Sequence, residues 1–241
     1  MVATTPRLLR TSDAAQIPTI RHAVHDYALW IGAAAALGFA VSFIFSGLLE
    51  MPRSWFLLFY VGATAPFLIA YFRWTGVDIP GALRHHWRIG TIGAVVIGAF
   101  TVFRMLQEDA SPRPEGLALV GDILWLGVVY GAVDALLLSV LPVSAVWLAL
   151  KSLGRTSTWK QKIFAGVVAM LASIVVTTAY HLGFAEYRDS TLASPVIGNS
   201  IFSLGYLLTA NPITAVFAHI AMHIASVIHG IDTTVTLPPH Y

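Results

Sequence analysis

The feature that most constrains the fold is a series of long segments that carry almost no charged side chain. A membrane-spanning helix needs about 20 predominantly apolar residues. Segments near or above that length are Ala28–Leu49, Ser54–Phe72, Ile89–Phe103, Leu117–Leu150, Ile163–Phe184, Val196–Ala210 and Pro212–His229. The composition agrees, because only 11% of the residues are charged, against about 25% in a soluble domain. We therefore expect an all-α, polytopic transmembrane helical bundle of about seven to eight spanning segments.

The fourth segment is too long for a single straight crossing. Its 34 residues, Leu117–Leu150, would form a helix of roughly 51 Å, whereas the hydrocarbon core is about 30 Å thick. It must therefore tilt and kink, protrude, or break, and Gly131 and Pro142 are the expected break points. Gly127 and Gly131 form a pair of small residues four apart, which lets another helix approach closely.

The basic residues favour one orientation. With seven crossings and the N-terminus in the cytoplasm, the inner segments hold ten Lys and Arg and the outer segments four. Eight crossings would divide them seven against seven. Because cytoplasmic loops are enriched in Lys and Arg, we expect seven crossings, although a kinked or re-entrant fourth segment fits equally. The protein is expected in a bacterial inner membrane, with its N-terminus cytoplasmic and the lipid bilayer as its first partner.

Two further counts exclude classes of function. The formal net charge is only +2, which gives no support for nucleic-acid binding. The chain contains no cysteine, so disulfides, cysteine-ligated metals and a thiol nucleophile are all excluded.

A few ionisable side chains fall within the spans, where each costs at least about 2.5–3.5 kcal/mol and needs a partner or a function. They are Asp122, Asp134, His181, His219, His223 and, at the membrane interface, His229. His219 and His223 are four residues apart, which places both imidazoles on one helical face and allows them to chelate one metal ion.

A depth argument selects Asp134 as the carboxylate partner. If the basic segment near Ser157 is the turn of a helical hairpin, Asp134 lies 23 residues before it and His181 lies 24 residues after it. Both side chains then return to a similar depth and can face each other. Asp122 would lie roughly 18 Å farther along a straight helix and is the poorer partner.

The order of these residues matches three motifs. The pattern Glu-Glu-xxx-Arg, Phe-xxx-His and His-xxx-Asn is met by Asp134 at one glutamate position, by Thr177-Thr-Ala-Tyr-His181, and by His219-Ile-Ala-Met-His223. The paired glutamates, the arginine, the phenylalanine and the asparagine are absent, and histidine replaces the asparagine. In this order and spacing, roughly from residue 116 to residue 230, the chain resembles the CAAX-protease and bacteriocin-processing family of intramembrane proteases.

The resemblance implies an intramembrane, metal-dependent hydrolase that cleaves a peptide bond in a membrane-embedded or membrane-proximal substrate. His181, His219 and His223 would bind a divalent metal such as zinc, with Asp134 as the general base or a fourth ligand. Three histidine ligands that leave one position open form a catalytic zinc arrangement.

Two alternatives remain open. The first is a catalytically degenerate member of the family that uses its polar centre for binding, transport or contact with a partner. The second is a b-type haem protein in which His181 and His223, on different helices, ligate the iron.

With the resemblance included, the chain divides into four parts. They are an N-terminal cytoplasmic or interfacial segment (1–27), N-terminal transmembrane helices (28–106), a core bundle similar to that family (107–230) and a C-terminal tail (231–241). The tail ends in Leu-Pro-Pro-His-Tyr, which its two prolines make non-helical.

Overall fold

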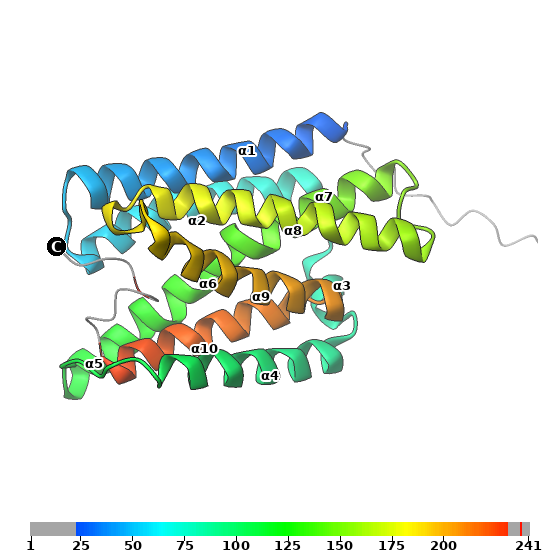
Figure 1. Ribbon diagram of the computed structural model, residues 1–241. Helices are drawn as coiled ribbons and strands as arrows, with labels where there is room; N and C mark the ends of the chain where they lie inside the picture. The colour runs from blue at the N-terminus through cyan, green and yellow to red at the C-terminus, as the bar shows by residue number, and fades with distance from the viewer. Residues whose placement is uncertain (1–22, 231–236, 238–241) are drawn as a thin grey trace, which may run out of the picture.

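A computed structural model describes residues 23–230 and residue 237, and the described part is a helical bundle without strands (Figure 1). Six of its helices are long and apolar enough to cross a membrane. They are α1 (Val24–Val41) with the π-helical η1 (Ser42–Leu48); α2 (Arg53–Thr75); α4 (Trp87–Met105); the fourth element, Gly116–Ser152; α8 (Trp159–Leu182); and α9 (Ala193–Thr209) with the 3-10 turn η5 (Ser190–Leu192). The expected fold class, an all-α polytopic helical bundle, is confirmed.

Each of the seven expected spans is helical, and the seventh is the shorter α10 (Ile213–His229). Two short elements lie between spans, α3 (Ile79–Arg84) and the 3-10 turn η4 (Ala185–Tyr187). Helix α1 begins at Val24, earlier than the expected start at Ala28. The expectations for residues 1–22 and for the tail, apart from Leu237, lie outside the described residues. Leu237 itself is buried in the main hydrophobic core.

The fourth element does not break at Gly131 or Pro142. It continues through α5 (Gly116–Asp122), the π-helical η2 (Ile123–Val129), α6 (Tyr130–Ala135), the π-helical η3 (Leu136–Val140) and α7 (Leu141–Ser152). In Figure 1 it runs obliquely across the bundle, from α5 at one end to α7 at the other. Its excess length is therefore accommodated by tilt.

Pro142 is tolerated because neighbouring helices replace the hydrogen bond that it removes. Proline has no N–H to donate to the carbonyl four residues earlier, which here is Leu138. That carbonyl instead accepts bonds from Ser173 Oγ at 2.7 Å and Asn199 Nδ2 at 3.3 Å. Replacement donors from adjacent helices are the usual condition for proline inside a membrane helix.

Gly127 and Gly131 bring α10 against the fourth element, as their spacing predicts. A Cβ added at Gly131 would lie 2.9 Å from Ile220 Cα, and one at Gly127 would lie 3.2 Å from Ile224 Cα. On the opposite side, Gly93 of α4 makes a similarly close contact with Thr214. Helix α10 is thus held in the interior between α4 and the fourth element, where its histidines meet Asp134.

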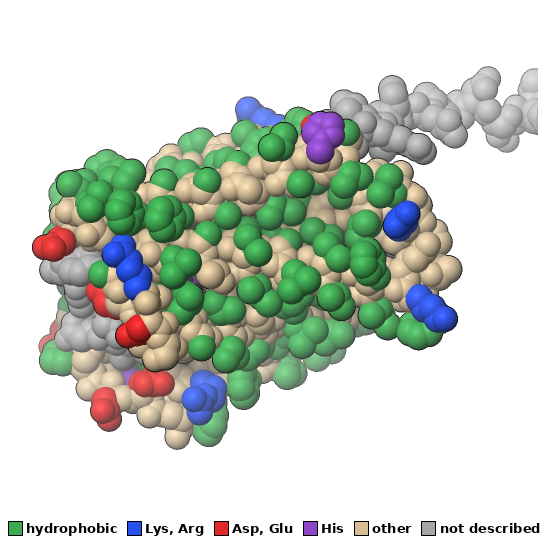
Figure 2. Space-filling model, turned by 45° about the horizontal axis from the view of Figure 1, so that its top comes forward, with side chains coloured by type: hydrophobic (Ala, Val, Ile, Leu, Met, Phe, Trp, Pro, Cys, Tyr) green, Lys and Arg blue, Asp and Glu red, His purple; other side chains and the backbone are tan. Residues whose placement is uncertain are grey.

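Charged residues collect at the two ends of the bundle (Figure 2), and hydrophobic side chains cover the surface between them. The end that holds the start of α1 carries Arg73, Arg84, Arg88, Lys151, Arg155, Lys160 and Lys162. The opposite end carries Glu50, Glu108, Asp109, Glu115, Asp122, Glu186 and Asp189, together with four arginines. We refer to these as the basic end and the acidic end.

Candidate functional site

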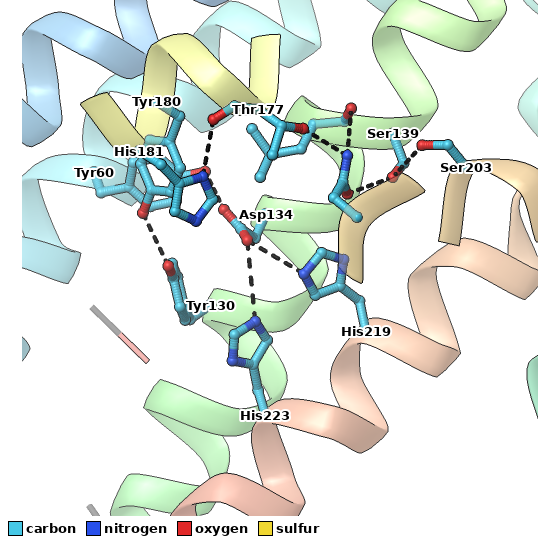
Figure 3. Close-up of polar contacts among 12 residues, drawn as sticks. Tyr60, Tyr130, Asp134, Ser139, Thr177, Tyr180, His181, Ser203, His219 and His223 are labelled. Carbon is cyan, nitrogen blue, oxygen red and sulfur yellow. Dashed lines mark hydrogen bonds and ion pairs between the residues drawn. The ribbon is translucent and has the colours of Figure 1, made fainter. Parts of the chain in front are cut away.

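The site is built around the carboxylate of Asp134, which is 3% exposed and lies on α6. The hydroxyl of Tyr60, on α2, donates a hydrogen bond to Asp134 Oδ1 at 2.9 Å. Asp134 Oδ2 lies 3.3 Å from His219 Nε2 and 4.0 Å from His223 Nε2. Figure 3 shows the carboxylate with the two histidines of α10 on one side and with Tyr60 and His181 on the other. Three helices distant in sequence therefore converge on one acidic group.

The two imidazoles of α10 are held in place by aromatic neighbours. Their rings are stacked on each other with centroids 5.1 Å apart. Phe202, on α9, stacks on the outer face of His219 at 4.3 Å, and the Tyr130 ring lies 4.7 Å from that of His223. Packing on both sides orients the Nε2 atoms toward Asp134 without requiring a ligand.

Asp134, His219 and His223 could hold a metal ion between them. One ligand atom from each lies within 4.8 Å of the other two, and all three residues are buried. With metal–nitrogen bonds of about 2.0–2.1 Å, two ligands on a tetrahedral ion are about 3.3–3.4 Å apart. The contact between Asp134 and His219 already has that length. His223 Nε2 lies 4.0 Å from Asp134 Oδ2, so His223 must move inward to share an ion with them.

His181 lines the same cavity but does not belong to that close set. Its Nδ1 lies 2.8 Å from the Thr177 carbonyl. A carbonyl only accepts hydrogen bonds, so Nδ1 carries the proton and Nε2 of the neutral ring has a free lone pair. The ring also packs edge-on against Tyr187, at 5.1 Å. Burial, and to a smaller extent nearby Glu186, raises the pKa of Tyr187 above its usual range, so that phenol stays protonated.

The side chains form the polar floor of a cavity of about 360 Å³. The floor consists of Tyr130, Asp134, His181, His219 and His223. Apolar side chains from α4, α9 and α10 form its walls, among them Phe100, Ile197, Ile201, Phe202 and Met222. Arg104 and Glu108 stand at its rim, at the acidic end of the bundle.

Sequence reasoning missed several residues at the site. Tyr130 could have been found, because it lies four residues before Asp134 and so shares its helical face. Tyr60 and Asn199 carry no local signal. Asn199 Nδ2 donates to Thr177 Oγ1 at 2.6 Å and to Ser173 Oγ at 3.0 Å, within a buried cluster of hydroxyls beside the cavity.

The other ionisable residues of the spans lie away from the cavity floor. Asp122 ends α5 and is half-buried. His229 ends α10, and its Nε2 donates to the carbonyl of Glu108 at 2.7 Å, at the acidic end of the bundle. The carboxylate at the centre of the site is thus Asp134 and not Asp122.

Comparison with known proteins adds no relative: no protein-family model, no curated protein and no solved structure matches the chain. A functional assignment therefore depends on the motifs and on the geometry of the site.

Proposed function

We propose that this protein is an intramembrane, metal-dependent hydrolase, a divergent relative of the CAAX-protease and bacteriocin-processing family. One observation carries the proposal: Asp134, His219 and His223 place three ligand atoms within 4.8 Å of one another on the floor of a cavity. Two nitrogens and one oxygen suit zinc or a similar divalent ion. Burying these groups in a bilayer is expensive, which favours a functional role.

The residues have separable roles in the proposed reaction. Asp134, His219 and His223 would hold a divalent cation, which would supply Lewis-acid chemistry for the hydrolysis. Tyr60 orients the carboxylate. His181 accepts a proton on Nε2 as water attacks the carbonyl carbon. It returns that proton to the leaving amine as the carbon–nitrogen bond breaks, which yields an acid and an amine.

The far nitrogen of the His219 ring predicts metal binding of moderate strength. Metal-bound imidazoles usually donate their second N–H to a partner, and loss of such a partner typically weakens binding about 10–100-fold. His219 Nδ1 is buried and has no hydrogen-bond partner among the described residues. We therefore expect weaker binding than at a closed structural zinc site.

The orientation we propose places the basic end, and with it the N-terminus, in the cytoplasm of a bacterial cell. The positive-inside rule supports this orientation, because seven of the eleven Lys and Arg within residues 23–230 lie at that end. The rim of the cavity, with Arg104 and Glu108, then faces the extracytoplasmic side. The substrate we propose is a membrane-embedded or membrane-proximal peptide.

The test is metal analysis of the purified protein with matched histidine variants. The native chain should retain about one divalent ion per molecule, and His219→Ala or His223→Ala should lose both the ion and peptidase activity. His229→Ala is the control, because that histidine lies on the same helix but outside the cluster.

A double variant at His219 and His223 with unchanged metal content and activity would overturn the proposal. A native protein without metal would favour the alternative role in binding, transport or partner contact. A visible absorption spectrum of the same sample tests the haem hypothesis, because bound haem would give a strong band that a zinc hydrolase lacks.

A further inference from the structure

Helices α4 and α9 are close together at the basic end and separate toward the acidic end. Near the basic end, Gly93 of α4 lies against Thr209, and Gly205 of α9 lies against Ile97. Farther along, the cavity lies between the C-terminal half of α4 and the N-terminal half of α9. Figure 1 shows α9 sloping away from α4 in this direction.

The side chains between the separated halves face the cavity and the outer surface at once. Ile197, on α9, is 62% exposed, and Phe100, on α4, is 49% exposed, yet both line the cavity. Gly198 lines it too, and a Cβ added there would meet nothing within 4 Å. Phe100, Ile197 and Gly198 therefore border a lateral opening in the apolar surface, which we call the portal.

The polarity of the cavity is graded from its floor to the portal. The floor is polar, the walls and portal are apolar, and Arg104 and Glu108 stand at the rim. A purely polar substrate would leave the apolar walls without contacts, and a purely apolar one would desolvate Asp134 and its histidines at a high cost. A molecule with an apolar chain and a polar group matches both regions.

We infer that an amphiphile enters the cavity through the portal between α4 and α9, in the half of the bundle nearer the acidic end. Its apolar chain stays in the portal, and its polar group reaches Asp134. The inference rests on the proposed function in naming this molecule as the substrate and in taking the orientation proposed there. With the basic end in the cytoplasm, the amphiphile comes from the extracytoplasmic leaflet.

The sidedness is tested by single cysteines, because the native chain has none. Ser194 is exposed at the start of α9 and lines the cavity, and Ser157 is exposed at the basic end. A membrane-impermeant maleimide added to intact cells should label Ser194→Cys, and it should label Ser157→Cys only after permeabilisation. The reverse pattern would overturn loading from the extracytoplasmic leaflet.

The portal is tested with a photoreactive, diazirine-bearing long-chain fatty alcohol, whose polar group is uncharged, in membranes that contain the full chain. Cross-links should map to the facing halves of α4 and α9. Gly198→Leu fills the portal and should reduce them by about tenfold. Gly166→Leu is the control, because a Cβ there also meets nothing within 4 Å but Gly166 lies on α8, away from the cavity. Phe100→Ala, which widens the portal, should increase labelling.

Equal labelling of the native chain, Gly198→Leu and Gly166→Leu would overturn the portal. The readout is independent of catalysis, because cross-linking should persist in His219→Ala. If metal and activity are absent but labelling follows the portal variants, the proposed function fails and the portal stands. If activity is present and Gly198→Leu changes neither activity nor labelling, the portal fails and the proposed function stands.

Discussion

The hydroxyl of Tyr60 donates a 2.9 Å hydrogen bond to Oδ1 of Asp134, between residues 74 positions apart in the sequence. Both side chains are buried, and the bond comes from a helix whose side chains do not line the cavity. Because it occupies one carboxylate oxygen, it directs the other oxygen, Oδ2, toward His219 and His223. This contact links the N-terminal helices to the site.

Tyr60→Phe should retain the metal and lower activity by about tenfold, since a hydrogen bond to a charged group is worth about 1.5–3 kcal/mol. Tyr71→Phe is the matched control, because it removes a buried hydroxyl from the same helix that bonds Ser144 at 2.8 Å, away from the site. The measurements are metal content and kcat/KM. Equal losses of activity in both variants would show that Tyr60 acts only through stability.

Gly131→Ala should separate α10 from the fourth element. The added Cβ would lie 2.9 Å from Ile220 Cα and 3.1 Å from His223 Cδ2, so the backbone must move and His223 moves away from Asp134. Metal affinity should fall by about 10- to 100-fold, as measured by competition with a chelator. Gly121→Ala lies on the same element in open space and should leave affinity unchanged. Weaker binding in both variants would argue against a specific contact at Gly131.

The Leu138 carbonyl provides a test of how Pro142 is accommodated. Ser173→Ala or Asn199→Ala alone leaves that carbonyl one of its two interhelical donors, and each interhelical bond lost should cost about 0.6 kcal/mol. The double variant removes both of these donors, and an unsatisfied buried carbonyl costs about 1–3 kcal/mol more. Adding Pro142→Ala supplies an N–H and should recover part of that loss. The free energy of unfolding in detergent is measured for each variant. If the losses of the two single variants simply add and Pro142→Ala recovers none of the stability, the proposed role of the two donors is contradicted.

His181→Ala should separate proton transfer from metal binding. Because His181 lies outside the close ligand set, the variant should keep its metal, whereas loss of a positioned base lowers kcat by about 10²–10⁴-fold. Metal content and kcat are measured on the same preparation. Loss of the metal together with activity would instead make His181 a ligand, as the family resemblance implies.

The positions of the helices were predictable from local sequence because the bilayer imposes a simple rule. Each uncharged segment must satisfy its backbone internally, and a helix does so. The seven segments accordingly correspond to helices, with ends that differ by a few residues. The close contact at Gly127 and Gly131 was equally predictable, because small residues four apart remove the steric barrier to a neighbouring helix.

The continuity of the fourth element could not be predicted. Proline is normally a signal for a break, but here Ser173 and Asn199 supply the missing donors from helices distant in sequence. A donor across a helix interface depends on the rotation of both helices, and no local pattern encodes that rotation. The two π-helical segments were missed for the same reason.

The sequence alone determined that this chain is a helical membrane protein, and that Asp134, His181, His219 and His223 are the ionisable residues most in need of partners. Hydrophobicity and the cost of burying charge act locally, so they can be derived from the order of the residues. Only the tertiary structure decided that His219 and His223 lie next to Asp134. It also decided that His181 lines the cavity outside this cluster of three, and that Tyr60 donates a hydrogen bond to the carboxylate. Those outcomes depend on how the helices pack and rotate against one another, which is a property of the whole bundle.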